Sequence, residues 1–303
     1  MASKSAETLD PVLVTGGTGQ VGSATLRVLR EAGVAACAPS RADLDLLDEA
    51  SIKAFLARNR CRAVIHCAAF TAVDRAEDEA DLADAINARA PAVLAAETAR
   101  LGLPIIHLST DYVFGGTKPG LYKEDDETNP LGVYGRTKLA GETAVRAANP
   151  NHAIIRTAWV LSAWGSNFLN TMLRLGADRD DISVVDDQCG CPTSATDIAH
   201  ALFAVLSALG DRGGTWHFVN SGSATWFALA EHIFSLANQA GQKTPRLHAI
   251  STAAYPTKAR RPANSRLSTD LIARDFGLEP RDWREAVRSI MAEKFPASVE
   301  SEQ

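Results

Sequence analysis

The segment VLVTGGTGQVGSATLRVLREAG, residues 12–33, decides the fold, because it runs from an apolar β-type stretch through a glycine turn into a helical pattern. Gly16 permits a tight turn, Gly19 lets a phosphate group approach the backbone, and Gly22 lets the helix pack closely on the strand. The helix N-terminus adds free N–H groups and a partial positive charge. The segment therefore predicts a site for the diphosphate of a dinucleotide.

The rest of the N-terminal half repeats this strand-and-helix pattern. The predicted strands cover 11–16, 34–39, 62–69, 103–110 and 152–161, and the predicted helices cover 20–32, 49–59, 79–100 and 134–149. Apolar strands separated by amphipathic helices indicate βαβ units in a parallel sheet that is buried on both faces. We therefore predict an α/β fold with a Rossmann-type, doubly wound parallel sheet.

In the C-terminal half, strands and helices alternate less regularly. Strands are predicted at 182–188 and 214–221, helices at 194–209, 226–240 and 282–294, and a loop rich in Pro and Arg at 251–267. We predict a cofactor-binding core with the catalytic residues over 10–161. A smaller α/β lobe over 162–296 would mainly bind substrate, with some segments returning to the core. The ends, 1–9 and 297–303, are expected to be disordered.

Composition limits the function classes. The chain has 303 residues, 46% of them hydrophobic and 22% charged, with a formal net charge of −5. This charge gives no general attraction to nucleic acid or to an anionic membrane. The polar N-terminus lacks a signal-peptide core, and no apolar run is long enough for a membrane helix. Five scattered cysteines favour free thiols in a reducing cytoplasm, and Cys189 and Cys191 alone make a poor zinc motif, so no metal site is predicted.

The end of the second predicted strand bears on the choice between the two nicotinamide cofactors. An acidic residue there usually bonds the ribose 2′-hydroxyl. This chain has Ser40 and Arg41, whose hydroxyl and guanidinium suit a 2′-phosphate. In the alternative interpretation, Arg41 lies on a solvated surface. We predict that NADPH is accepted at least as well as NADH, and that Asp45 and Leu46 contact the adenine.

Tyr134 and Lys138 lie four residues apart near the start of a predicted helix, so both side chains share one face. A positive charge about 4 Å from a phenol, at an effective dielectric constant of about 20, stabilises the phenolate by roughly 4 kcal/mol. That is enough to lower a tyrosine pKa by up to about three units, before desolvation opposes the shift. Tyr134 is therefore a candidate proton donor with Lys138 as its partner.

The fourth predicted strand ends in STDYVF, residues 109–114, which places Thr110 and Asp111 at the carboxyl edge of the sheet. Thr110 would hydrogen-bond the substrate oxygen and polarise it. Taken alone, a tyrosine four residues before a lysine is more often a packed aromatic beside a surface lysine. The glycine loop, the S-T-D strand end and the Tyr/Lys helix occur in the order that a reductase site requires, and this favours catalysis.

With these motifs the chain resembles the extended short-chain dehydrogenase/reductases and, among them, the dTDP-4-dehydrorhamnose reductase family. The resemblance covers nearly the whole chain. The motifs that carry it are GQVG (19–22), AAFTAVDRAE (68–77), STDYVF (109–114), YGRTKLAGE (134–142), RTAWV (156–160), NF (167–168), DQCGCPT (187–193) and RPANSRL (261–267).

The resemblance implies NAD(P)H-dependent reduction of the 4-keto group of dTDP-6-deoxy-L-lyxo-4-hexulose to dTDP-L-rhamnose, the last step of dTDP-rhamnose biosynthesis. It implies Tyr134 as proton donor, with Lys138 and Thr110 as partners. The cofactor would be lined by the glycine loop and by further residues that include both catalytic partners: Gly16, Gly19, Gln20, Val21, Gly22, Ser40, Arg41, Asp45, Leu46, Ala68, Ala69, Phe70, Thr71, Tyr134 and Lys138. The dTDP-sugar would contact Thr110, Asp111, Trp159 and Asn167.

The chain departs from the family at a magnesium site through which some members dimerise. Two glutamates of that site align with Ala24 and Thr196, and only Glu293 remains as an acid. Magnesium prefers several hard oxygen ligands. We therefore predict no magnesium-bridged dimer, and a monomer or weak homodimer instead.

The sequence leaves two other functions open. A sugar-nucleotide epimerase or dehydratase shares the glycine loop and the Tyr/Lys pair, but it retains NAD through turnover. Some relatives are non-catalytic regulatory subunits that bind NADP and a partner enzyme. The intact Thr110, Tyr134 and Lys138 argue against that last possibility.

Overall fold

The computed structural model describes residues 10–296, so the expectation of disorder at 1–9 and 297–303 concerns residues outside the described part. Six parallel strands form the central sheet, in the order β10-β5-β4-β3-β1-β2. Their bounds are β1 (Val12–Thr15), β2 (Ala36–Cys37), β3 (Ala63–His66), β4 (Ile105–Thr110), β5 (His152–Thr157) and β10 (Gly214–His217). Because β2 and β3 flank β1, the chain reverses its progress across the sheet there. The predicted doubly wound fold is confirmed.

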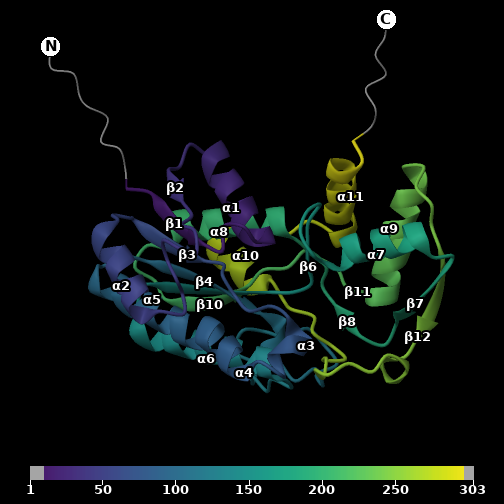
Figure 1. Cartoon of the computed structure of the whole chain (residues 1–303), viewed down its shortest axis with the longest axis horizontal. Helices are drawn as coiled ribbons and strands as arrows, with labels where there is room; N and C mark the ends of the chain where they lie inside the picture. The colour runs from purple at the N-terminus through teal and green to yellow at the C-terminus, as the bar shows by residue number, and fades with distance from the viewer. Residues whose placement is uncertain (1–9, 297–303) are drawn as a thin grey trace, which may run out of the picture.

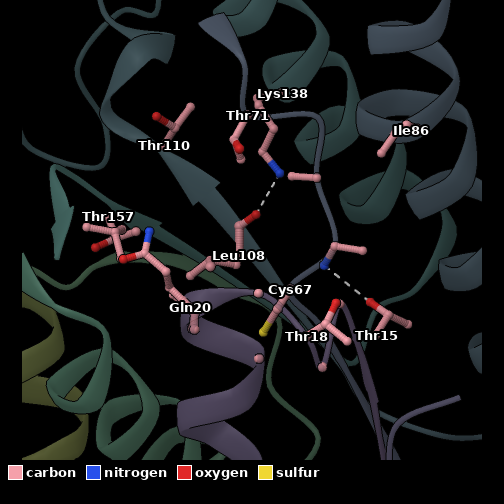
Figure 2. Close-up of a pocket in the computed structure, with 18 of the residues that line it drawn as sticks. Thr15, Thr18, Gln20, Cys67, Thr71, Ile86, Leu108, Thr110, Lys138 and Thr157 are labelled. Carbon is pink, nitrogen blue, oxygen red and sulfur yellow. Dashed lines mark hydrogen bonds between the residues drawn. The ribbon is translucent and has the colours of Figure 1, made fainter. Parts of the chain in front are cut away.

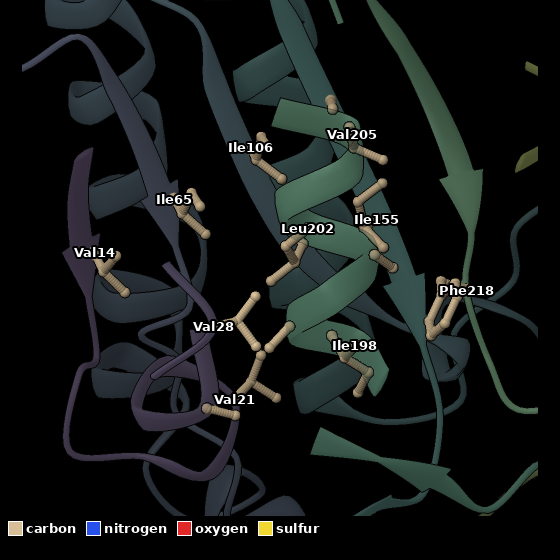
Figure 3. Packing of buried hydrophobic residues seen from close by; sticks show 14 of the residues in the cluster. Val14, Val21, Val28, Ile65, Ile106, Ile155, Ile198, Leu202, Val205 and Phe218 are labelled. Atoms are coloured by element: carbon tan, nitrogen blue, oxygen red, sulfur yellow. The ribbon is translucent and has the colours of Figure 1, made fainter. Parts of the chain in front are cut away.

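Helices cover both faces of this sheet (Figure 1). One face carries α1 (Gln20–Glu31), α8 (Ala195–Ala208) and α10 (Asp270–Phe276), and the other carries α2 (Glu49–Arg58), α5 (Ala90–Arg100) and α6 (Val133–Ala148). The strand side chains alternate between the two layers, as the pleat requires. Leu13, Val64, Ile105 and Ile154 face α2, α5 and α6. Val14, Ile65, Ile106 and Ile155 pack toward α1 and α8 (Figure 3).

The helix predicted over 79–100 is not one regular helix. It consists of α4 (Ala80–Asp84), a π-helical turn η1 (Ala85–Arg89) and α5, and the short α3 (Val73–Ala76) precedes it. The π turn buries Asn87, whose backbone carbonyl packs against α6, where a Cβ on Gly141 would lie 2.1 Å from that oxygen. Such π turns are frequent near functional sites, and this one supports the loop that follows β3.

A smaller lobe lies at the opposite end of the molecule from α2 and α5 (Figure 1). Its helices are α7 (Phe168–Asp178), α9 (Trp226–Gln239) and α11 (Trp283–Lys294), and its strands are β7 (Asp181–Val185), β8 (Cys189–Gly190), β11 (Ala224–Thr225) and β12 (Arg246–Ile250). β7 pairs with β12 in parallel and β8 with β11 in antiparallel fashion. The third small sheet joins β6 (Val160–Leu161) to β9 (Thr193–Ser194), and thus connects β5 to the lobe.

Short helical turns complete the chain: η2 (Asp111–Val113) follows β4, and η3 (Thr252–Ala254) lies in the loop predicted at 251–267. That loop returns to the core, since Arg261 forms a two-pronged ion pair with Asp74 in α3, with Nη2 2.8 Å from Oδ2. Within residues 10–296, no helix is both long and apolar enough to cross a membrane.

Candidate active site

A cavity of about 980 Å³ opens at the carboxyl ends of the central strands (Figure 2). This is the edge at which open α/β sheets bind ligands. Its walls include the loops after β1, β2 and β3, the end of β4, the first turns of α6 and the link from β5 to β6. All the residues predicted to line the cofactor and the substrate contribute to these walls, with the exception of Phe70.

The glycine loop has the geometry that its sequence predicted. Gly16 adopts a φ of 70°, and a Cβ there would lie 2.7 Å from the backbone nitrogen of Ala68. A Cβ on Gly22 would lie only 2.1 Å from the carbonyl oxygen of Gly16, so α1 packs directly on the turn. Gly19 is the N-cap of α1 and contributes no side-chain cap. The first N–H groups of α1 are therefore available for a diphosphate.

Phe70 does not line the cavity. Its ring packs with Ala76, Ala83 and Val133 in a buried cluster beneath the loop after β3. Its backbone is fixed by Asn87, whose Oδ1 accepts from the Phe70 N–H at 2.8 Å and whose Nδ2 donates to the Phe70 carbonyl at 3.1 Å. The Phe70 side chain thus anchors the loop, and the contact of this residue with the cofactor stays a prediction.

The rim of the cavity near the end of β2 holds a positively charged and a negatively charged side chain, Arg41 and Asp45. The Arg41 side chain is 76% exposed, and its Nε lies 3.7 Å from Oδ1 of Asp45. Ser40 Oγ donates to Oδ2 of Asp43 at 2.6 Å. A guanidinium suits a 2′-phosphate, whereas a carboxylate suits a 2′-hydroxyl. The rim is therefore compatible with NADPH and with NADH.

Lys138 is buried in the wall of the cavity, where its Nζ donates to the carbonyl of Leu108 at 2.7 Å (Figure 2). His107 Nε2 lies 3.4 Å from the same ammonium. Burial lowers the pKa of Lys138 to about 8. Burial and the charge of Lys138 lower the pKa of His66 to about 3 and hold that of His107 well below its usual value. Both imidazoles are therefore neutral at pH 7, and Lys138 carries the local positive charge.

Tyr134 and Thr110 lie together at the start of α6 and the end of β4. Burial raises the pKa of Tyr134 to about 12, and the neighbouring Thr110 hydroxyl offsets this only in part. The sequence predicted a lowered pKa, but the ammonium of Lys138 is directed at Leu108, and desolvation of the phenol dominates. Tyr134 is consequently a protonated phenol at neutral pH, which is the form that a proton donor needs.

Asp111 lies beside Thr110 and is almost fully buried. Thr110 Oγ1 donates to its Oδ1 at 3.0 Å, whereas its Oδ2 has no hydrogen-bond partner within residues 10–296. Burial raises the pKa of this carboxyl to about 6. An unpaired buried carboxylate oxygen at the wall of a cavity suits a hydroxyl donor on a ligand.

Asn167 lines the cavity, but its amide is engaged within the protein. Its Nδ2 donates to Oε1 of Gln20 at 2.8 Å, and its Oδ1 caps α7 by accepting from the N–H of Asn170. Ser162 Oγ donates to the same Gln20 oxygen at 2.6 Å. These bonds join the glycine loop to the lobe, and they leave the Asn167 amide little capacity for direct substrate binding.

Four residues at or near the site were not predicted from the sequence. Trp226 at the start of α9 also lines the cavity, as do Ser166 and Thr157. Arg27 on α1 donates to Glu293 Oε1 at 2.9 Å and to Thr196 Oγ1 at 2.8 Å. The arginine thus links two of the three positions that align with the family's magnesium site. The motif alignment singled out Thr196 and Glu293, but it gave no sign of Arg27.

A doubly wound sheet whose glycine loop and Tyr/Lys pair face one cavity is the arrangement of a short-chain dehydrogenase/reductase. Within that class, the chain belongs to the RmlD substrate binding domain family, whose model matches residues 10–295.

Relatives with known names support this assignment over almost the whole chain. The dTDP-4-dehydrorhamnose reductase of Sinorhizobium fredii is 44% identical over 283 residues, which cover 92% of this chain and 95% of that protein. The Escherichia coli enzyme of the same name is 42% identical over 242 residues, covering 78% of this chain and 81% of that protein. Both chains are thus similar to this one across both of its halves.

Solved structures agree. A dTDP-4-dehydrorhamnose reductase from Clostridium acetobutylicum superimposes with a TM-score of 0.89 at 36% identity, covering 93% of this chain and 99% of that one. The Bacillus anthracis enzyme, solved in complex with NADP, gives a TM-score of 0.89 at 33% identity, with 94% and 99% covered.

Proposed function

We propose that this protein is an NAD(P)H-dependent dTDP-4-dehydrorhamnose reductase, which converts dTDP-6-deoxy-L-lyxo-4-hexulose to dTDP-L-rhamnose in the last step of dTDP-rhamnose biosynthesis. The observation that carries the proposal is the convergence of Thr110, Tyr134 and Lys138 on the cavity that the glycine loop also lines. The family membership indicates that the substrate is a sugar nucleotide. The reaction reduces a ketone to a secondary alcohol, with hydride added at C4 and a proton at O4.

The walls of the cavity fit a dinucleotide. The backbone turns tightly at Gly16 and Gly22, where a Cβ would clash, and the start of α1 offers free N–H groups to a diphosphate. The cofactor supplies the hydride when it is bound. Residues 40–46 would hold the adenosine end, Ala68, Ala69 and Thr71 would flank its middle, and Lys138 would hold the nicotinamide end.

The chain's own residues have separate tasks in this proposal. Tyr134, a protonated phenol, donates its proton to O4 as negative charge develops there. Lys138 places a buried positive charge beside the phenolate that forms, and charge stabilisation of this kind is worth most in a low-dielectric site. Thr110 orients the keto oxygen, while Asp111 and Trp159 contact the sugar nucleotide.

A coupled assay tests the proposal. The keto sugar is generated from dTDP-4-keto-6-deoxyglucose by the preceding epimerase, and loss of NADPH absorbance is recorded together with the product. The expected result is one dTDP-L-rhamnose formed for each NADPH consumed. NADPH consumption without that product, or no consumption at all, would contradict the proposal.

The two rival functions give different results in the same assay. An epimerase or dehydratase would purify with bound nucleotide and would not consume added NADPH. The similarity to a UDP-glucose 4-epimerase is 19% in sequence and concerns the fold alone. A regulatory subunit would bind NADP without turnover.

Further parts of the proposal concern cellular setting and assembly. We place the protein in the cytoplasm, with a dTDP-sugar as its ligand and no nucleic acid partner. We assign the cofactor and the catalytic residues mainly to 10–161 and the substrate contacts mainly to 162–296. The Arg27 link between Thr196 and Glu293 supports a monomer or weak homodimer that needs no magnesium.

A further inference from the structure

Two tryptophans that are distant in sequence stack on one another at the wall of the cavity. Trp159 follows β5, and Trp226 is the first residue of α9. Their ring centroids lie 3.4 Å apart and their planes differ by 4°. Phe168, at the start of α7, packs on Trp226 with a centroid distance of 4.7 Å. Since both tryptophans line the cavity, their stacked rings form part of its wall, and Phe168 packs against Trp226 at an interplanar angle of 44°.

Trp159 is held in an unfavourable backbone conformation. Within residues 10–296, it is the one non-glycine residue with a positive φ, at 44°. This conformation is costly for a bulky side chain, and it persists only where the surroundings enforce it. The Trp159 carbonyl accepts from the N–H of Thr193 at 3.1 Å. Strain of this kind concentrates at ligand-binding sites, so the placement of this ring calls for a functional explanation.

The motif DQCGCPT, residues 187–193, provides the seat for both rings. Gln188 Oε1 accepts from Nε1 of Trp226 at 3.1 Å, and Gln188 Nε2 donates to Thr252 at 2.9 Å. A Cβ on Gly190 would lie 2.3 Å from Cε2 of Trp159, so the indole fits only because this position is glycine. The glutamine and the glycine of this motif are thus explained by the two tryptophans that they hold.

The register of the sheet places the stack beside the reaction centre. Thr157 pairs with Thr110 across β5 and β4. Trp159 follows Thr157 by two residues, which span at most about 7 Å. The sugar that is reduced at Thr110 and Tyr134 therefore lies close to the Trp159 ring. An indole face suits the apolar C–H face of a 6-deoxyhexose.

We propose that Trp226 is a positioning residue for the substrate sugar. It stacks on the Trp159 ring and holds it in place, so that the hexose meets a fixed aromatic surface. Gln188 bonds the Trp226 indole, and Gly190 leaves space for the Trp159 indole. The inference rests on the proposed function, because that function supplies the sugar. It assigns the contribution of Trp226 to the hexose and not to the nucleotide part of the ligand.

Binding of two ligands tests this assignment: dTDP-L-rhamnose, which carries the hexose, and dTDP, which lacks it. Calorimetry on Trp226→Ala is expected to show dTDP-L-rhamnose weakened on the order of tenfold, with dTDP changed less than about twofold. Trp226→Phe keeps a flat ring and should recover most of the loss. Gly190→Ala, which displaces the Trp159 ring, should reproduce the Trp226→Ala pattern. In turnover, KM for the keto sugar should rise while KM for NADPH stays constant.

Trp216→Phe is the matched control, since Trp216 is a buried tryptophan of β10 that bonds Asp275 and does not line the cavity. It should leave both affinities unchanged. An equal loss for dTDP and dTDP-L-rhamnose in Trp226→Ala, or no loss for either, would overturn the inference. Failure of the proposed function has a different signature: the wild-type protein would bind both ligands but consume no NADPH with the keto sugar.

Discussion

The buried charge of Lys138 should lower the unfolding free energy of the protein. Its ammonium is buried and accepted by the Leu108 carbonyl, and its pKa falls from 10.5 to about 8 because burial penalises the charged form. At about 1.4 kcal/mol per unit, holding this charge at pH 7 costs about 3 kcal/mol. Lys138→Met removes the charge, but it leaves the Leu108 carbonyl unpaired at a cost of about 1–3 kcal/mol.

The net prediction for Lys138→Met at pH 7 is a change in unfolding free energy between zero and a gain of about 2 kcal/mol, with reduction slowed at least about 100-fold. The pH dependence is the sharper signature. Because the folded-state pKa lies below the unfolded value, the unfolded wild type binds the extra proton between about pH 8 and pH 10.5, and wild-type stability rises with pH in that window. From pH 7 to pH 9.5 the wild type should gain about 2 kcal/mol relative to the variant.

Urea denaturation of both proteins at several pH values measures this difference. His66 and His107, whose pKa values Lys138 also lowers, titrate below pH 7, so the contributions of the other groups cancel in this pH window when the unfolding free energies are subtracted. A stability difference that does not change between pH 7 and pH 9.5 would refute the claim that Lys138 is a buried charge with a lowered pKa.

Three further predictions concern the cofactor loop, the rim and the assembly. Gly22→Ala places a Cβ 2.1 Å from the Gly16 carbonyl and should weaken NADPH binding at least about tenfold; Gly120→Ala, where a Cβ meets nothing within 4 Å, is the control, and equal effects would contradict the packing argument. Arg41→Ala should raise KM for NADPH about tenfold and leave KM for NADH nearly unchanged, whereas equal changes would show that Arg41 does not contact a 2′-phosphate. EDTA should leave the mass measured by light scattering unchanged, because Arg27 already bonds Thr196 and Glu293; a dimer that EDTA dissociates would contradict this.

The sequence was sufficient for those parts of the fold that depend on local pattern. Consecutive apolar residues such as Leu13 and Val14 point to opposite faces of a strand, so runs of them predicted a sheet with helices on both sides. The glycine spacing predicted the turn, because only glycine at position 16 fits against Ala68 and only glycine at position 22 fits against Gly16. The four-residue spacing predicted that Tyr134 and Lys138 share a helix face and a cavity.

Contacts between distant segments could not be predicted in this way. Phe70 turns away from the cofactor site because Asn87, in a π turn, holds its backbone. The pKa of Tyr134 rises because burial, which depends on the whole fold, outweighs the hydrogen bond with Thr110. Trp226 reaches the cavity because the start of α9 stacks on Trp159, just after β5, and no local pattern indicated that contact.

The most direct test of the central claim compares Tyr134→Phe with Tyr122→Phe in the coupled assay with the keto sugar and NADPH. Tyr122 is the control, because it is a buried tyrosine that does not line the cavity. Tyr134→Phe should slow formation of dTDP-L-rhamnose by about 100- to 10,000-fold, while the dissociation constant for NADPH changes less than about twofold. Tyr122→Phe should retain the wild-type rate. Undiminished product formation by Tyr134→Phe would contradict the assignment of Tyr134 as the proton donor.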